Sequence, residues 1–283
     1  HGGEPRRGSR GDASPETTRE PQDAKPGGGG GTPLSCGHAE RPSLVRHQMG
    51  MMNKFGRLQG TRPLTHIDGV AVSDLVAKYG SPLFVFSERT LVQRYRELYQ
   101  AFARRYAKVR ISWSYKTNYL EAICRVFHRE GAWAEVVSQF EFDKAVKTGV
   151  SPDRIHFNGP YKPDAAIEAA LRGRAIIHID NFDELARIER IAEQLGIRPR
   201  VALRINLAVE GLQPWSRFGL NLESGQAREA AVRLVAGDKA DLVGLHCHIG
   251  TFILAPVAYG IAAAKMVQFA NQLKSELGVK LSF

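Results

Sequence analysis

Ser114-Tyr115-Lys116-Thr117-Asn118 is the stretch that decides the fold, and it ends a run of alternating apolar and polar residues. From Val109 to Lys116, Val, Ile, Trp and Tyr alternate with Arg, Ser, Ser and Lys. A period of two predicts a strand with two unlike faces. The sequence therefore indicates a strand over 109–116 whose polar face ends in a lysine.

Lys116 stands where a barrel enzyme places reactive groups. In a parallel barrel wrapped by helices, the outward face of each strand packs on the helices, and the inward face at its carboxyl end lines the active-site mouth. A lysine held there among small hydroxyl side chains suits Schiff-base chemistry through a desolvated amine. The alternative is that Lys116 only ends a strand and points into water.

Strands and helices alternate regularly after Lys116, which predicts right-handed βαβ units and a parallel sheet. An eight-stranded barrel needs roughly 250 residues, so the stretch 84–283 is about three quarters of one. The predicted fold class is α/β, a parallel (β/α)8 TIM-type barrel truncated before its last strands; an open doubly wound sheet is the alternative. The predicted strands begin at Val109, Trp133, Ile155, Ala175, Arg200 and Leu242, with the start of a seventh at Leu281.

Cap residues mark where several helices begin. Ser87 and Asn181 each precede an apolar helical stripe, and Ser138 with Glu141 forms a capping box. Ahead of these, the pattern predicts a short helix over Val72–Tyr79 and a brief strand over Pro82–Phe86.

Composition divides the chain into three parts. Residues 1–55 are rich in Gly, Pro and Arg and nearly free of aliphatic periodicity, which predicts a disordered tail. Residues 56–86 are predicted to be a lead-in, and 87–283 the incomplete barrel. The glycine run over 26–31 has no strand before it and no helix after it, so it indicates a linker rather than a phosphate loop.

Charge and cysteine content argue against several classes of function. The net charge is +10, but the basic residues are not interleaved with aromatic ones, so nucleic acid is not an expected partner. Cys36, Cys124 and Cys247 are odd in number and far apart, which predicts a reduced, cytoplasmic protein without disulfides or a zinc cluster. No apolar stretch is long enough to span a bilayer, so no membrane partner is expected.

A second informative stretch is Gly244-Leu245-His246-Cys247-His248-Ile249-Gly250-Thr251. Alternation places His246 and His248 on the inward face near a strand end, and Gly250 and Thr251 offer bare backbone and a hydroxyl to a phosphate. The histidines could bind a metal, as in a metal-dependent barrel hydrolase, but further ligands are not evident. They could instead be buried structurally, or His248 could lie flat against an aromatic cofactor.

Taken in order, these motifs resemble those of the fold-type III, alanine-racemase-like pyridoxal 5′-phosphate (PLP) decarboxylases. The resemblance runs from about Ile67 to Phe283, and it is specific because six motifs occur together. The matching segments are Ser114–Asn118, Glu135–Ser138 with Glu141, Phe157–Lys162, Ala202–Asn206, Ser216–Gly219 and Gly244–Thr251. Within the family, the double histidine and the stretch 141–147 are most similar to diaminopimelate decarboxylase.

The resemblance implies two catalytic residues, Lys116 and His248. Lys116 would hold PLP covalently and be displaced by the substrate amine, and His248 would stack on the pyridine ring. Gly250 and Thr251 would approach the phosphate. No metal is implied.

Four further positions receive a role from the same resemblance. Arg204 would lie beneath the cofactor, and Glu135 and Glu141 would line its ring and aldehyde side. Arg217 would lie near the substrate. Glu135 departs from the family, which usually has aspartate there, and this leaves its distance to the cofactor open.

The implied activity is decarboxylation of a basic or diamino acid, most of all conversion of meso-diaminopimelate to lysine. The alternatives are decarboxylation of ornithine, arginine or lysine, racemisation on the same barrel, and a non-catalytic PLP-binding homologue. The implied partners are a small amino-acid substrate and a second subunit in a homodimer. The family's phosphate loop, pyridine-binding glutamate and carboxyl-terminal β-domain would follow Phe283, so we expect this stretch alone to be inactive.

Overall fold

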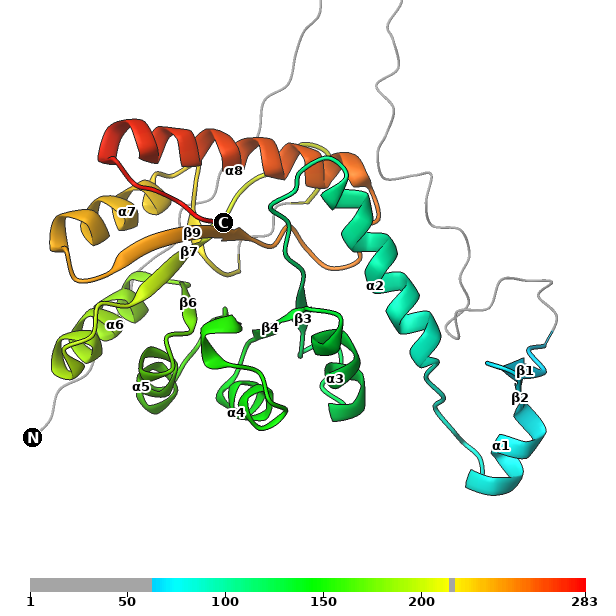
Figure 1. Ribbon diagram of the computed structural model, residues 1–283. Helices are drawn as coiled ribbons and strands as arrows, with labels where there is room; N and C mark the ends of the chain where they lie inside the picture. The colour runs from blue at the N-terminus through cyan, green and yellow to red at the C-terminus, as the bar shows by residue number, and fades with distance from the viewer. Residues whose placement is uncertain (1–62, 214–216) are drawn as a thin grey trace, which may run out of the picture. The chain divides into compact units, whose positions relative to one another are not determined.

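The computed structural model describes residues 63–213 and 217–283 (Figure 1), which belong to one compact unit, Ser43–Phe283. The predicted tail, 1–55, and the first part of the predicted lead-in lie outside the described residues. None of the helices described is both long and apolar enough to cross a membrane.

Strands and helices alternate through most of this unit. The strands are β1 (His66–Ile67), β2 (Val70–Ala71), β3 (Ser112–Ser114), β4 (Trp133–Val136), β5 (Ile155–Phe157), β6 (Ile176–Ile179), β7 (Arg200–Asn206), β8 (Leu220–Asn221) and β9 (Asp241–Cys247). The helices are α1 (Val72–Tyr79), α2 (Glu88–Ala103), α3 (Glu121–Arg129), α4 (Gln139–Lys147), α5 (Asp164–Arg172), α6 (Phe182–Leu195), α7 (Gln226–Gly237) and α8 (Pro256–Leu277), with a 3-10 turn at Pro152–Arg154.

A two-stranded hairpin opens the described part. β1 and β2 pair antiparallel through Asp68 and Gly69, whose φ angles of 51° and 85° fit the tight turn that Asp-Gly favours. Helix α1 has the predicted bounds and ends at Gly80. The strand predicted over Pro82–Phe86 is wrong, because these residues form no strand and lead directly into the cap of α2, Ser87.

The larger sheet is parallel, and its strands follow chain order from β3 to β7, with β9 on the far side of β7. Figure 1 shows this sheet as a curved wall with the intervening helices along its outer side. Doubly wound sheets reverse their strand order and carry helices on both faces. The structure therefore confirms the predicted barrel architecture, as part of a barrel.

β7 carries the densest pairing in the sheet. Its neighbour β6 pairs with it as far as Leu203, and the two-residue strand β8 pairs with it at Ile205 and Asn206. The sequence did not predict β8, because two residues within a long loop carry no periodicity. The predicted seventh strand at Leu281 is not formed as a strand, although Ser282 N donates to Val243 O (2.7 Å).

Alternation along the strands separates a polar inward face from an apolar outward face. On β6, Ile177 and Ile179 are fully buried in the main core between sheet and helices. His178, between them, packs instead edge to face against His156 of β5 and His246 of β9 inside the curve. The inward face therefore carries the polar groups from which a site can be built.

Helices α4 and α6 begin in the same way, each with a glutamate carboxylate that accepts a backbone hydrogen bond. Ser138 Oγ accepts from Glu141 N, and Asn181 Oδ1 accepts from Glu184 N, as the predicted caps require. The glutamate carboxylates differ from a simple capping box, because each reaches the amide before the cap. Glu141 Oε2 accepts from Val137 N (2.8 Å), and Glu184 Oε2 accepts from Asp180 N (2.9 Å). Each carboxylate thus ties a strand end to the following helix.

Replacing Gly159 with alanine is expected to destabilise the fold by about 3 kcal/mol or more. A Cβ added there would lie 1.9 Å from the backbone oxygen of Val137, which cannot rotate away. The matched control is Gly260→Ala in α8, where a Cβ meets nothing within 4 Å; it should raise stability by about 0.5–1 kcal/mol. Urea unfolding of both variants measures this, and equal effects would contradict the close approach.

Candidate active site

Lys116 lies in the turn that follows β3. The strand ends at Ser114, and Ser114 O accepts backbone hydrogen bonds from Thr117 N (3.2 Å) and Asn118 N (3.5 Å). The prediction that the strand runs to Lys116 is therefore wrong at its end, because the chain turns directly after the strand. Lys116 is exposed, so its amine is accessible at the carboxyl edge of the sheet.

Tyr115 anchors this turn on the outer side of the sheet. Its side chain is fully buried, and its hydroxyl lies 2.9 Å from His128 Nε2. His128 Nδ1 lies 2.9 Å from Ala132 O, an acceptor, so Nδ1 carries the proton and Nε2 accepts from Tyr115. Burial raises the pKa of Tyr115, so its hydroxyl remains a donor. Because Tyr115 is fixed by this contact, the backbone of the adjacent Lys116 is fixed as well.

Three histidines lie side by side inside the curve of the sheet, one each from β5, β6 and β9. His156 Nδ1 lies 3.0 Å from His178 Nε2, and the rings of His178 and His246 are 5.0 Å apart. The ring of Phe283 packs 5.0 Å from His156. Burial is the main cause that lowers the pKa of His156 to about 4 and of His246 to about 3. This histidine cluster is therefore neutral near pH 7.

Lys116 is an electrostatic neighbour of both histidines of the second motif. Burial first, and the charge of Lys116 second, lower the pKa of His248; Arg204 adds to this effect and Glu135 opposes it. Burial and Arg204 lower the pKa of His246, with smaller contributions from His248 and Lys116. The charges of Lys116 and Arg204, from two of the predicted motifs, thus lower the pKa values of the histidines of a third motif.

Glu135 and Glu141 lie on the same side of the site. Glu135 is aligned with Ser114 of β3 and with His156 of β5 in the sheet register. Burial raises the pKa of Glu141, the Val137 amide opposes this, Glu135 raises the pKa further, and Lys116 lowers it. Glu135 and Lys116 therefore both lie near enough to Glu141 to shift its pKa, in opposite directions.

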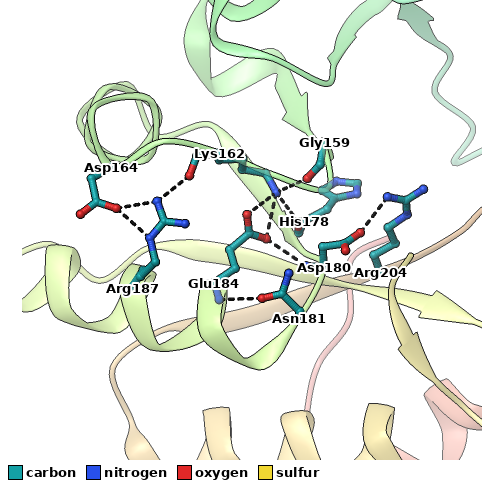
Figure 2. A network of polar contacts seen from close by, with 9 residues as sticks. All are labelled: Gly159, Lys162, Asp164, His178, Asp180, Asn181, Glu184, Arg187 and Arg204. Carbon is teal, nitrogen blue, oxygen red and sulfur yellow. Dashed lines mark hydrogen bonds and ion pairs between the residues drawn. The ribbon is translucent and has the colours of Figure 1, made fainter. Parts of the chain in front are cut away.

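Arg204 is buried on β7 and paired with a residue that the sequence interpretation missed. Its Nη1 donates to Asp180 Oδ1 at 2.7 Å (Figure 2). Its guanidinium also lies 4.9 Å from the ring centre of Phe218. Asp180 follows β6, directly after Ile179. The signal that could have found Asp180 is alternation, which places it two residues beyond His178 on the same face.

Figure 2 also shows a buried lysine that the sequence interpretation left without a role. Lys162 is fully buried, and its Nζ lies 2.9 Å from both carboxylate oxygens of Glu184. Burial lowers the pKa of Lys162 and raises the pKa of Glu184, and the attraction between the two charges opposes both shifts. A partner 22 residues away leaves no local pattern, so this pair had no signal in the sequence.

The remaining predicted site residues lie on loops. Gly250 has a φ of 130°, a backbone conformation that favours glycine, and Thr251 beside it is exposed. Arg217 is exposed and directly follows residues 214–216, which the structure does not describe. The phosphate role of Gly250 and Thr251 and the substrate role of Arg217 stay predictions.

The inward face has the unpaired polar atoms that a polar aromatic cofactor would need. Ser114 Oγ, Glu135 Oε1, His178 Nδ1 and His246 Nδ1 are buried without a hydrogen-bond partner among the described residues. Such atoms cost about 1–3 kcal/mol each unless a ligand or water pairs them. The residues present therefore fit PLP. No group of three or more His, Cys, Asp or Glu in 63–213 and 217–283 is arranged to hold a metal ion.

The histidine cluster is expected to make the fold sensitive to acid. The folded protein keeps these imidazoles neutral, while in the unfolded chain they bind protons near pH 6.5. The free energy of unfolding should therefore fall as the pH drops from about 6.5 towards 4, by at most about 1.4 kcal/mol per pH unit for each histidine. Urea unfolding at several pH values should show a shallower slope for His156→Gln. His66→Gln, at an exposed hairpin residue, is the control. Equal slopes for both variants would contradict this account.

Comparison with known proteins agrees with this geometry. The family model described as pyridoxal-dependent decarboxylase, pyridoxal binding domain, matches residues 89–283. The diaminopimelate decarboxylase of Bacillus subtilis is 31% identical over 232 residues, which are 79% of this chain and 51% of that protein. That of Halalkalibacterium halodurans is 34% identical over 225 residues, 76% of this chain and 51% of that protein.

A solved structure shares the fold. The diaminopimelate decarboxylase of M. jannaschii, in co-complex with L-lysine, aligns with a TM-score of 0.70 at 31% identity, covering 76% of this chain and 52% of that one. This chain spans about half the length of the curated relatives it matches. The family match covers most of the chain and includes every predicted site residue. The chain therefore belongs to the pyridoxal-dependent decarboxylases, a family whose cofactor is pyridoxal 5′-phosphate.

Proposed function

We propose that this chain acts in the PLP-dependent decarboxylation of a basic or diamino acid, with conversion of meso-diaminopimelate to lysine as the favoured reaction. The observation that carries the proposal is the grouping of Lys116 with His246, His248 and Glu141, whose pKa values its charge lowers. The substrate follows from the relatives, which are diaminopimelate decarboxylases at about 30% identity. One structural neighbour was solved with L-lysine bound.

Each predicted site residue has a place in this proposal. Lys116 would hold the cofactor through its Nζ, and its position in an exposed turn would leave it open to displacement by a substrate amine. His248 packs against the cofactor ring as a neutral imidazole, because burial and Lys116 lower its pKa. Gly250 and Thr251 receive the phosphate, and Arg217 meets the substrate.

The buried positive charge of Arg204 on the inward face suits a ring that takes up an electron pair. PLP, when bound, accepts the electron pair left by the departing carboxylate. Arg204, held by Asp180, keeps a fixed positive charge on this face, and it helps to hold His246 and His248 neutral. Glu135 supplies a buried oxygen that still lacks a partner, so it can accept a hydrogen bond from the bound group.

Other reactions fit the same barrel. Arginine and lysine decarboxylases among the structural neighbours are only 20–21% identical to this chain, and that similarity speaks for the fold alone. Decarboxylation of ornithine, arginine or lysine, racemisation, and PLP binding without catalysis therefore remain the alternatives to meso-diaminopimelate decarboxylation.

A homodimer in the cytoplasm completes the proposal. The dimer rests on the family resemblance. The cytoplasmic compartment rests on the odd number and wide spacing of the cysteines in the sequence.

Borohydride reduction in the presence of PLP should place a stable pyridoxyl group on Lys116. The exposed amine at the edge of the sheet is the one next to the neutral histidines. Peptide mapping by mass spectrometry should find the label in the wild type and in Lys147→Ala, a change at an exposed lysine of α4, and should not find it in Lys116→Ala. A label on another lysine of the wild type would refute the assignment.

The protein translated as far as its own stop codon and loaded with PLP should release carbon dioxide from meso-diaminopimelate with a higher kcat/KM than from other amino acids. L-Lysine, L-ornithine and L-arginine serve as competing substrates, and Lys116→Ala should lower the rate by about three orders of magnitude or more. A preference for ornithine or arginine would overturn the substrate assignment. Bound PLP with no carbon dioxide release from any of the four would favour a non-catalytic homologue.

A further inference from the structure

The amine of Lys162 is surrounded by four acceptors, more than one ion pair requires. Its Nζ donates to Gly159 O (2.7 Å) and His178 O (2.9 Å) as well as to the Glu184 carboxylate. Gly159 follows β5, and His178 is on β6. One ammonium group thus joins the ends of two neighbouring strands to the start of α6 (Figure 2).

Glu184 completes the clamp from the helix side. Its Oε2 also accepts from Asp180 N (2.9 Å), and its own backbone amide donates to Asn181 Oδ1 (2.8 Å). The carbonyl of His178 and the amide of Asp180 are therefore both fixed by the same buried pair. The backbone over 178–180 is held from both ends.

The side chains at the two ends of this clamped segment both face the candidate site. The ring of His178 packs 5.0 Å from that of His246, and Asp180 Oδ1 accepts from Arg204 Nη1 at 2.7 Å. Arg204 in turn lowers the pKa of His246 and His248. A change at Lys162 would therefore reach the cofactor side of the sheet through Asp180 and Arg204.

Stability alone is a weak reason for such a pair. Taking two charges out of water costs several kcal/mol, and apolar replacements of buried ion pairs are often neutral or stabilising. Directed hydrogen bonds, by contrast, fix backbone positions that apolar packing leaves looser. The four acceptors of Lys162 are arranged for that purpose.

We propose that Lys162 and Glu184 are a positioning pair that sets Asp180, and through it the Arg204 guanidinium, for binding PLP. The proposal rests on the proposed function, because it assumes that the inward face is the PLP site. It assigns a role to residues that touch neither cofactor nor substrate.

The test is a double-mutant cycle on PLP affinity in the full chain. Lys162→Met with Glu184→Leu removes both charges together, so that neither is left buried alone. The pair of changes should weaken PLP binding by about tenfold, which is the range for losing one charge-assisted hydrogen bond. In an Arg204→Met background the same changes should alter affinity less than about twofold, because the group they position is gone.

Spectroscopy and a surface control separate positioning from folding. The visible circular dichroism of bound PLP, expressed per bound cofactor, should change in the Lys162/Glu184 variant and stay unchanged in Arg172→Gln with Glu168→Gln. That control removes an ion pair of α5 with side chains 61% and 47% exposed. Urea midpoints record stability independently.

A second variant keeps the proposal testable if the first fails to fold. Asp180→Asn retains the backbone amide that Glu184 binds but removes the charge facing Arg204. It should weaken PLP binding in the wild type and not in the Arg204→Met background. Equal losses in both backgrounds would overturn the positioning role. A wild-type chain that binds no PLP would instead refute the proposed function, so the two failures are distinct.

Discussion

Polar side chains that are buried must find partners, and this constraint governs the inward face of the sheet. β4, β5, β6, β7 and β9 each turn at least one ionisable side chain inward, where water cannot hydrate it freely. On that face Arg204 pairs with Asp180, and the same constraint pairs Lys162, after β5, with Glu184 of α6. The histidines meet the constraint by staying neutral, since burial lowers their pKa values. The atoms still unpaired, such as Ser114 Oγ and Glu135 Oε1, mark where the face can take a ligand.

Most of the fold could be predicted because its signals are local. The caps Ser87, Ser138 and Asn181 begin helices where the sequence places them, since a cap and its target lie within three residues. Strands were predicted from alternation; β7 has the predicted bounds, and most of the others end earlier than predicted. The errors arose where local pattern is poor: 82–86 is apolar but does not pair, and β8 is too short to show a period.

The site was only partly predictable, for a related reason. Motifs within one short stretch of sequence, such as His246 and His248, can be recognised from the spacing of their residues. The partners of Arg204 and Lys162 lie 24 and 22 residues away and become neighbours only when the parallel strands align. A lone lysine after a strand looks the same in sequence whether it is buried or exposed. Only the packing of α6 against β6 distinguishes the two cases.

Two lysines with opposite surroundings illustrate how the fold assigns their chemistry. Glu141 and Glu184 occupy the same position in their helices, and each accepts the amide before the cap. Lys162 is enclosed beside Glu184 with every N–H directed at an acceptor, so its amine has no hydrogen free and no path to a small molecule. Lys116 lies in an exposed turn. Its charge lowers the pKa of Glu141, but Glu141 does not bury it as Glu184 buries Lys162. A nucleophilic amine must be able to lose a proton and meet a carbonyl carbon. Of these two lysines, only Lys116 is exposed and can meet a carbonyl carbon, and this supports its assignment as the residue that holds the cofactor.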